Sequence, residues 1–242
     1  MANKRSRSKT KDQQVTRVRN TIIAVLALIV LVIVGFGMYV TTPLSERGEI
    51  VAGEDYTVVD NPRPTRPGPI QVAEFFSYAC VHCKDFEPAL EDWLASQGED
   101  VAFKRVPVTW SPAQTVLAQA YVTLEATDAL DANHGRIFRA IHDTRKQFLT
   151  PESVAEYVDG RGVSKQEFMR EFNSPRTREQ MREVERQLQR YRVNATPSVV
   201  VAGKYVVGMQ GGPARALQVV DHLIAQEKAD GAAGAATESP GS

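Results

Sequence analysis

The sequence predicts an α/β domain with a long helical insertion, preceded by one N-terminal transmembrane helix. Three observations support this fold class: an uncharged apolar run at 21–40, a strand–helix–strand pattern across 70–108, and helical patterning from about 111 to 192 between two strand-bearing parts. With 242 residues, 43% hydrophobic and 24% charged, the chain can bury one core of ordinary size. This composition excludes a collagenous or wholly disordered protein.

The first forty residues have the pattern of an uncleaved membrane anchor. Residues 1–20 hold seven basic side chains and one acidic one, and residues 21–40 hold no charge. A helix of about 20 residues spans about 30 Å, the thickness of a bilayer's hydrocarbon core. Because basic flanks stay in the cytoplasm, we expect a basic cytoplasmic segment at 1–20, a transmembrane signal anchor at 21–40, and export of everything that follows. A cleaved signal peptide and a buried core helix are the alternatives.

Two stretches of biased composition frame the folded part. Residues 41–54 are polar and turn-rich, so we expect a tether there. Residues 229–242 are rich in Ala, Gly, Ser and Pro and predict a disordered tail. One domain at 55–228 lies between them. The formal net charge of zero gives no general attraction to nucleic acid, so we expect no such partner.

The first half of this domain has the pattern of a β-α-β unit. Residues 56–59 favour an edge strand before a Pro-rich turn, and residues 70–78 are apolar on both faces, which is typical of a central strand. Residues 84–97 place apolar side chains at helical spacing and end at Gly98. Residues 101–108 alternate as a second strand.

The second half has helix starts followed by a hairpin. Four N-cap residues mark helix starts in the insertion at about 111–192: Ser111, Thr150, Ser164 and Thr177. Residues 198–202 and 205–209 flank the two-residue turn Gly203-Lys204, which predicts a β-hairpin. Pro213 opens a final amphipathic helix.

The chain has two cysteines, in the stretch Cys80-Val81-His82-Cys83. A disulfide between them closes too small a loop to add much stability through chain entropy, so redox chemistry explains an exported pair better. Zinc binding is the competing interpretation, but it needs two further ligands. The other histidines form no close second pair: His134, His142 and His222. We therefore expect no metal and no cofactor.

The position of the motif, between a strand and a helix, favours an activated thiol. Cys80 would lie at the helix N-terminus, where unpaired backbone N–H groups and the helix dipole stabilise a thiolate. We expect a lowered pKa for Cys80, which makes it the attacking sulfur, and a shielded resolving thiol at Cys83. His82 is predicted to tune the thiolate, while Val81 shapes the surface beside it.

Two stretches of the chain resemble the DsbA family of thiol:disulfide oxidoreductases, members of the thioredoxin superfamily. One is Tyr56-Thr57 followed by residues 72–87, VAEFFSYACVHCKDFE, and the other is residues 193–205, VNATPSVVVAGKY. The helical insertion between them has the family's arrangement. The resemblance covers nearly all of 55–228 and implies a thioredoxin fold with a helical insertion.

The resemblance also implies a cis peptide at Thr196-Pro197, in a loop that lies beside the sulfurs and faces an extended substrate. Two positions depart from the best-known members of the family. Val81 stands where they have Pro, and Thr196 stands where they have Val. These positions bear on the redox potential and on the choice of partner.

Glu74 is an acidic side chain in an otherwise apolar strand. Either it points to solvent, or it is buried and relays a proton to Cys83. The resemblance places Glu74 and Glu87 at acidic positions near the family's active site. Lys104 or Arg105 is then the expected basic partner of Glu74, since the strand register is open.

These features predict a membrane-tethered thiol:disulfide oxidoreductase that introduces disulfide bonds into exported proteins through Cys80 and Cys83. We expect a single-pass protein of the bacterial inner membrane, with its N-terminus cytoplasmic and its catalytic domain periplasmic. The resemblance implies unfolded or reduced exported proteins as substrates and a DsbB-type membrane quinone reductase as reoxidant. A reductase or isomerase of the same fold and a non-catalytic binding module at the membrane are the alternatives.

Overall fold

The computed structural model describes residues 20, 23, 25–32, 48–62 and 68–237. The chain separates into two compact units, Met1–Glu49 and Ile50–Ser242. In the first unit, residues 25–32 are helical. None of the helices in the described ranges is both long enough and apolar enough to cross a membrane. Much of the predicted anchor at 21–40, almost all of the segment at 1–20 and half of the tether at 41–54 lie outside the described residues.

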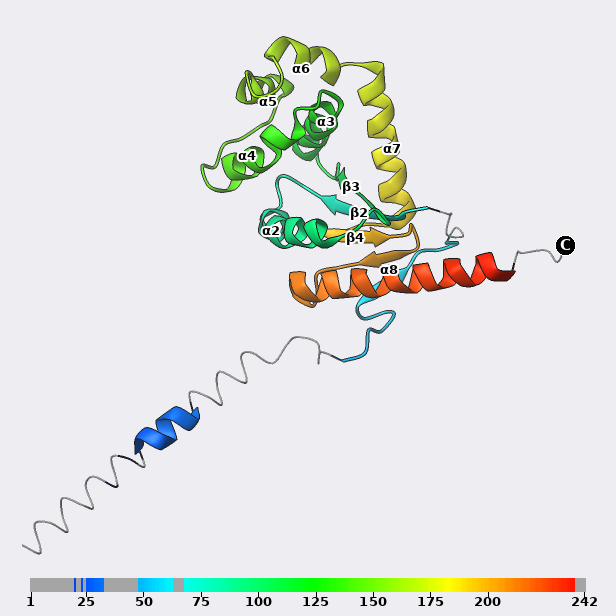
Figure 1. Cartoon of the computed structure of the whole chain (residues 1–242). Coiled ribbons are helices and arrows are strands. Elements are labelled where there is room, and N and C mark those ends of the chain that lie inside the picture. Colours follow the sequence, from blue (N-terminus) through cyan, green and yellow to red (C-terminus); the bar gives the residue numbers. More distant parts are fainter. Residues whose placement is uncertain (1–19, 21–22, 24, 33–47, 63–67, 238–242) are drawn as a thin grey trace, which may run out of the picture. The chain divides into compact units, whose positions relative to one another are not determined.

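The second unit is built on one mixed sheet (Figure 1). The described strands run in the order β1-β5-β4-β2-β3, with these bounds: β1 Tyr56–Val58, β2 Ile70–Phe76, β3 Val101–Pro107, β4 Ser198–Val201 and β5 Tyr205–Val207. As predicted, β2 is central, because it pairs in parallel with β3 and antiparallel with β4. Within the described sheet, β1 is an edge strand that pairs with β5.

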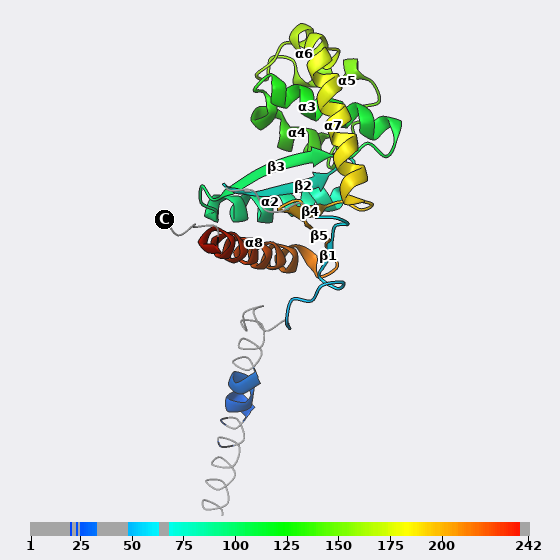
Figure 2. The same cartoon turned by 90° about the vertical axis from the view of Figure 1, so that its right-hand side faces the viewer.

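Helices cover both faces of the sheet (Figures 1 and 2). On one face, α2 (Val81–Ser96) and α8 (Gly212–Thr237) pack against β2 and β4, and Val72 and Phe86 share their apolar cluster. The helices of the insertion lie on the other face, where Phe75 belongs to a second cluster. Alternate side chains of β2 thus enter two cores, which explains why this strand is apolar on both faces.

The predicted helical insertion between β3 and β4 is confirmed. Its described helices are α3 Pro112–Ala126, α4 Leu130–His142, α5 Pro151–Val158, α6 Lys165–Phe172 and α7 Pro175–Tyr191. The N-cap side chains predicted at Ser111, Thr150 and Ser164 each accept a hydrogen bond from a backbone amide of the first turn. The helix start predicted at Thr177 is wrong, because Ser174 caps α7 and accepts from the Thr177 amide. Proline loses no hydrogen bond at the first helical position, so the Ser-Pro pair starts this helix earlier.

Both ends of α8 have features that the sequence analysis does not predict. The sequence predicts a disordered tail from residue 229, but α8 continues through Thr237, and residues 238–242 lie outside the described residues. Alanine has the highest helix propensity, which offsets the glycines of this stretch. Near the other end of α8, Arg215 donates two hydrogen bonds of 2.8 Å to the Asp55 carboxylate. This ion pair fixes the chain where it enters the domain.

Replacing Leu223 by Ala will destabilise the domain. Leu223 lies on α8 and is completely buried in the cluster between α8 and the sheet. Such a substitution leaves a cavity and costs about 2–5 kcal/mol of unfolding free energy, which urea unfolding measures. Leu149→Ala is the matched control, because Leu149 is 61% exposed. It should cost less than about 0.5 kcal/mol, and equal losses for the two variants would contradict this packing.

Candidate active site

The two cysteines lie where β2 gives way to α2. Cys80 is the N-cap of α2, with φ −94° and ψ 116°, and the helix begins at Val81, three residues before the start at Lys84 that the sequence predicts. Cys83 lies in the first turn and is completely buried, whereas Cys80 is partly exposed. Both are free thiols in this structure. This arrangement presents one sulfur to a partner protein and shields the other.

Hydrogen-bond donors converge on the Cys80 sulfur and lower its pKa to about 5. The largest contribution is the hydrogen bond from the Cys83 thiol, and burial of the sulfur opposes it. Thr196 and the backbone amides of Cys83 and His82 add further hydrogen bonds. These amides belong to the unpaired first turn of α2, so the predicted effect of the helix N-terminus is present. At pH 7 Cys80 is therefore a thiolate.

The Cys83 thiol is shifted in the opposite direction. Its hydrogen bond to Cys80 and its burial raise its pKa well above the ordinary value, and the negative charges of Cys80 and Glu74 add to the effect. A thiolate formed on Cys83 therefore takes up a proton. The pair combines one stable leaving group with one sulfur that stays protonated.

The loop before β4 brings the second matched stretch of the chain to the sulfurs. The Thr196-Pro197 peptide is cis, as the resemblance implies. The Thr196 carbonyl oxygen lies 3.4 Å from the Cys80 sulfur. The side chains of Val81 and His82 are exposed, so the contact of His82 with Cys80 is made by its backbone amide.

Glu74 is completely buried, which excludes the solvent-facing interpretation. The strand register places it beside Arg105 of β3, whose Nε lies 3.3 Å from Oε2, so Arg105 rather than Lys104 is its partner. Neither carboxylate oxygen receives a well-oriented hydrogen bond from the described residues. Burial and then the charge of Glu87 raise the pKa of Glu74 to about 8, against the attraction of Arg105. At pH 7 this carboxyl therefore holds a proton.

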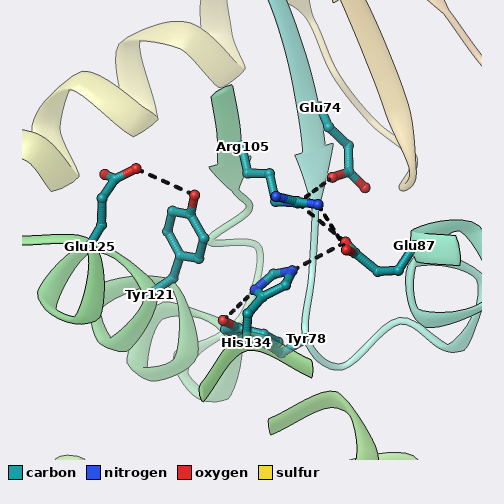
Figure 3. A network of polar contacts seen from close by, with 7 residues as sticks. All are labelled: Glu74, Tyr78, Glu87, Arg105, Tyr121, Glu125 and His134. Atoms are coloured by element: carbon teal, nitrogen blue, oxygen red, sulfur yellow. Dashed lines mark hydrogen bonds and ion pairs between the residues drawn. The ribbon is translucent and has the colours of Figure 1, made fainter. Parts of the chain in front are cut away.

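A network of polar contacts joins the expected residues Glu74, Arg105 and Glu87 to two side chains that the sequence analysis does not place in the site, His134 and Tyr78 (Figure 3). Arg105 donates from Nη2 to Glu87 Oε2 at 2.8 Å. Glu87 Oε1 lies 3.2 Å from His134 Nε2, and His134 Nδ1 lies 2.8 Å from the Tyr78 hydroxyl oxygen. Burial raises the pKa of Glu87, but its contacts with His134 and Arg105 have the larger effect, so the pKa of Glu87 is lowered overall. No sequence motif links α4 to the cysteines, so His134 had no signal beyond being a histidine.

The zinc interpretation finds no support in this geometry. Across the ranges that the structure describes, no three His, Cys, Asp or Glu side chains are grouped so that they could hold a metal ion. His134 contacts Tyr78 and Glu87, and Nε2 of His142 lies 2.9 Å from the Tyr78 carbonyl oxygen. The cysteine pair itself is the reactive group that this geometry offers.

A mixed sheet that delivers one half-exposed and one buried cysteine to the start of a helix, opposite a cis-proline loop, defines a class of proteins. This class is the thioredoxin-like thiol:disulfide oxidoreductases. A family model described as the DSBA-like thioredoxin domain matches residues 97–218. The chain belongs to this DsbA-like family.

Several characterised proteins are similar to the chain. The thiol:disulfide interchange protein DsbA of Pseudomonas aeruginosa is 35% identical over 188 residues, which cover 76% of this chain and 89% of that protein. DsbA of Azotobacter vinelandii is 37% identical over 183 residues, or 74% of this chain and 86% of that protein. The crystal structure of Pseudomonas aeruginosa DsbA has a TM-score of 0.72 and covers 75% of this chain and 96% of that chain. The protein is accordingly a disulfide oxidoreductase of the family that acts through a redox-active cysteine pair without a cofactor.

The thiol of Cys80 in the reduced protein will titrate near pH 5, as a thiol below this pH and a thiolate above it. Ultraviolet absorbance of the thiolate measures the midpoint. Cys83→Ala removes the largest hydrogen bond to the thiolate and should raise the midpoint by about 1–2 pH units. Cys80→Ser is the control that should abolish the transition. A midpoint near 8.5, the value of free cysteine, would contradict the geometry.

Proposed function

We propose that this protein donates the disulfide of Cys80 and Cys83 to newly exported proteins, and that residues 21–40 tether it to the bacterial inner membrane with the catalytic domain in the periplasm. The observation that carries the proposal is the lowered pKa of Cys80. A stabilised thiolate favours the reduced pair over the disulfide. The enzyme should therefore give its disulfide away.

Disulfide donation takes two exchange steps. A substrate thiolate attacks the Cys80 sulfur of the oxidised enzyme, forms a mixed disulfide with it, and breaks its bond to Cys83, which leaves as a thiolate. A second substrate thiolate attacks the substrate sulfur of the mixed disulfide, closes the substrate disulfide and releases Cys80 as a thiolate. Two electrons pass from the substrate to the enzyme. The lowered pKa of Cys80 makes it the better leaving group in the second step.

Glu74 supplies the proton that Cys83 needs after the first step. The pKa of Cys83 is raised, so its thiolate is unstable at neutral pH. Glu74 holds a proton under these conditions. Once ionised, its charge acts on Cys83 and raises the pKa of that thiol. Arg105 and Glu87 act on this carboxyl by attraction and repulsion and so tune how readily it releases the proton.

The loop at Thr196-Pro197 receives the substrate backbone. Its carbonyl oxygen lies 3.4 Å from the Cys80 sulfur, so an extended peptide bonded to Cys80 would run beside this loop and could pair with it as an added strand. Val81 is 45% exposed and offers an apolar contact next to the reactive sulfur. Unfolded exported chains expose the apolar side chains that such a surface accepts.

A DsbB-type membrane quinone reductase is the proposed reoxidant. The Cys80 thiolate would attack a disulfide of this partner, and the two electrons would pass on to a quinone. The proposal rests on membership of the family. A tether of about 14 residues has an end-to-end distance of roughly 20 Å, which would keep the enzyme close to a partner in the same membrane.

Two features support the membrane tether. Large apolar side chains between residues 23 and 32 are exposed in the first unit, from 47% at Ile29 to 68% at Leu31. Such side chains are more stable in lipid than in water. The basic side chains of residues 1–20 favour a cytoplasmic N-terminus.

A reductase or isomerase of the same fold is the second candidate. Thr196, directly before the cis-proline, is compatible with isomerases. A non-catalytic module that holds unfolded chains at the membrane would use the same surface without redox turnover. The three functions differ in the direction in which electrons move through the cysteine pair, or in whether they move at all.

The oxidised enzyme will convert a reduced two-cysteine peptide to its disulfide. Cys83→Ala, mixed instead with the oxidised peptide, will accumulate a mixed disulfide, because the Cys80 thiolate opens the peptide disulfide and no Cys83 thiol is present to release the enzyme. Mass spectrometry measures both products, and Cys80→Ser is the inactive control. In glutathione buffers the pair should be more oxidising than thioredoxin, whose potential is about −270 mV.

Three results would count against this function. A potential near that of thioredoxin would favour a reductase. Efficient refolding of a protein with scrambled disulfides would favour an isomerase. An intact cellular phenotype with Cys80→Ser would favour the binding module.

The full-length protein will stay with inner membranes during alkaline carbonate extraction, and its domain will be cut by protease added to spheroplasts. Leu28→Asp should release much of the protein, because an acidic side chain at the centre of a spanning helix costs about 2.5–3.5 kcal/mol. Val51→Asp, outside the proposed anchor, is the control and should change nothing. Complete extraction of the wild-type protein, or protection of the domain from external protease, would contradict the tether.

A further inference from the structure

The chain of polar contacts that runs from Glu74 to His134 in Figure 3 ends at the buried hydroxyl of Tyr78. Tyr78 is 1% exposed, and its hydroxyl oxygen lies 2.8 Å from His134 Nδ1. The rings of Phe76 and Phe138 pack against the imidazole, with centroids at 5.5 and 5.2 Å. The polar contacts of His134 are therefore made with Tyr78 on one side and Glu87 on the other.

One assignment of hydrogens gives each buried donor an acceptor. The Glu87 carboxylate accepts two hydrogen bonds from the Arg105 guanidinium and is charged, so His134 Nε2 carries the hydrogen that points to Oε1 at 3.2 Å. The Tyr78 hydroxyl then donates to the unprotonated Nδ1. A hydrogen on Nδ1 would leave the buried Tyr78 hydroxyl without an acceptor among the described residues, which is costly. The contacts therefore fix His134 as a neutral donor.

A neutral His134 determines the charge balance around Glu74. Among the described groups in this network, Arg105 is then the one cation, and it faces both Glu74 and Glu87. The other titratable groups that face Glu74, Arg105 or His134 carry no positive charge: Cys80, Cys83, Tyr78, Tyr121 and Glu125. Two buried carboxylates beside one cation cannot both ionise easily, so one of them keeps a proton.

The hydrogen bonds decide which carboxyl keeps that proton. Glu87 accepts hydrogen bonds from Arg105 and from His134, at 2.8 and 3.2 Å, and these stabilise its charge. Glu74 has the ion-pair contact with Arg105 but no well-oriented hydrogen bond from the described residues. The proton of the cluster therefore stays on Glu74.

We propose that Tyr78 and His134 are positioning residues that keep this proton on Glu74 by fixing the imidazole as a neutral donor to Glu87. A cationic imidazole would add a second positive charge, let both carboxylates ionise, and leave no proton for Cys83. Neither residue has to touch the reacting sulfurs for this effect. The inference rests on the proposed role of Glu74 as the proton source.

The protonation state of His134 is measurable in the full-length reduced protein by ¹⁵N NMR of its imidazole. At pH 7 we expect a protonated Nε2 and an unprotonated, hydrogen-bonded Nδ1. Tyr78→Phe should shift the Nδ1 resonance toward that of a free nitrogen and leave Nε2 protonated. Two protonated nitrogens at pH 7, or an Nδ1 resonance that Tyr78→Phe does not move, would overturn the inference.

A pair of variants separates the hydrogen bond of His134 from its charge. His134→Gln keeps a neutral N–H donor for Glu87, whereas His134→Lys adds a permanent cation. The infrared band of the protonated carboxyl, which Glu74→Gln identifies by its loss, gives the pH midpoint of Glu74. We expect the wild-type midpoint in His134→Gln and a midpoint lower by about one pH unit or more in His134→Lys.

A lowered midpoint in His134→Gln, an unchanged one in a folded His134→Lys, or no Glu74 band in the wild type at pH 7 would overturn the inference. If His134→Lys does not fold, the NMR measurement on the wild type decides. Disulfide donation by the wild type is a separate assay. Its failure would contradict the proposed function and would leave the measured state of His134 unaffected.

Discussion

The redox centre depends on the hydrogen bond from the Cys83 thiol to the Cys80 sulfur. This contact contributes most to the lowered pKa of Cys80 and also raises the pKa of Cys83. It exists only while the pair is reduced, so it favours the reduced enzyme over the disulfide. The pKa of Cys80 is lower in the folded protein than in the unfolded chain, so the stabilisation is present at high pH and is lost as the pH falls through about 5.

The same site contains a buried carboxyl group, an arrangement that would destabilise an ordinary protein core. Glu74 is completely buried, and its oxygens receive no well-oriented hydrogen bond from the described residues. A buried polar group in this state costs about 1–3 kcal/mol. Arg105 offsets part of this cost, but it is shared with Glu87. Packing on both faces of β2 holds the carboxyl in place, and such locally unfavourable positions are typical of functional sites.

The sequence predicts the parts of this structure that short-range patterns encode. The alternation of side chains in the strands and the helical spacing of apolar residues are sufficient to predict the β-α-β unit. The spacing of Cys80 and Cys83 is sufficient to predict the redox chemistry. The pairing of β2 with β3 is not encoded locally, so Lys104 and Arg105 are equivalent until the register places Glu74 beside Arg105. His134 reaches the site because α4 packs near the end of β2, a long-range contact that no local pattern contains. The end of α8 differs because alanine-rich composition suits both a helix and a disordered chain.

The ion pair between Asp55 and Arg215 has a mechanical consequence. Asp55 directly precedes β1, an edge strand of three residues that tension could peel from the sheet. The two hydrogen bonds of 2.8 Å connect Asp55 to α8, a helix of 26 residues. A pull on the preceding chain is therefore transmitted to this helix before it reaches β1.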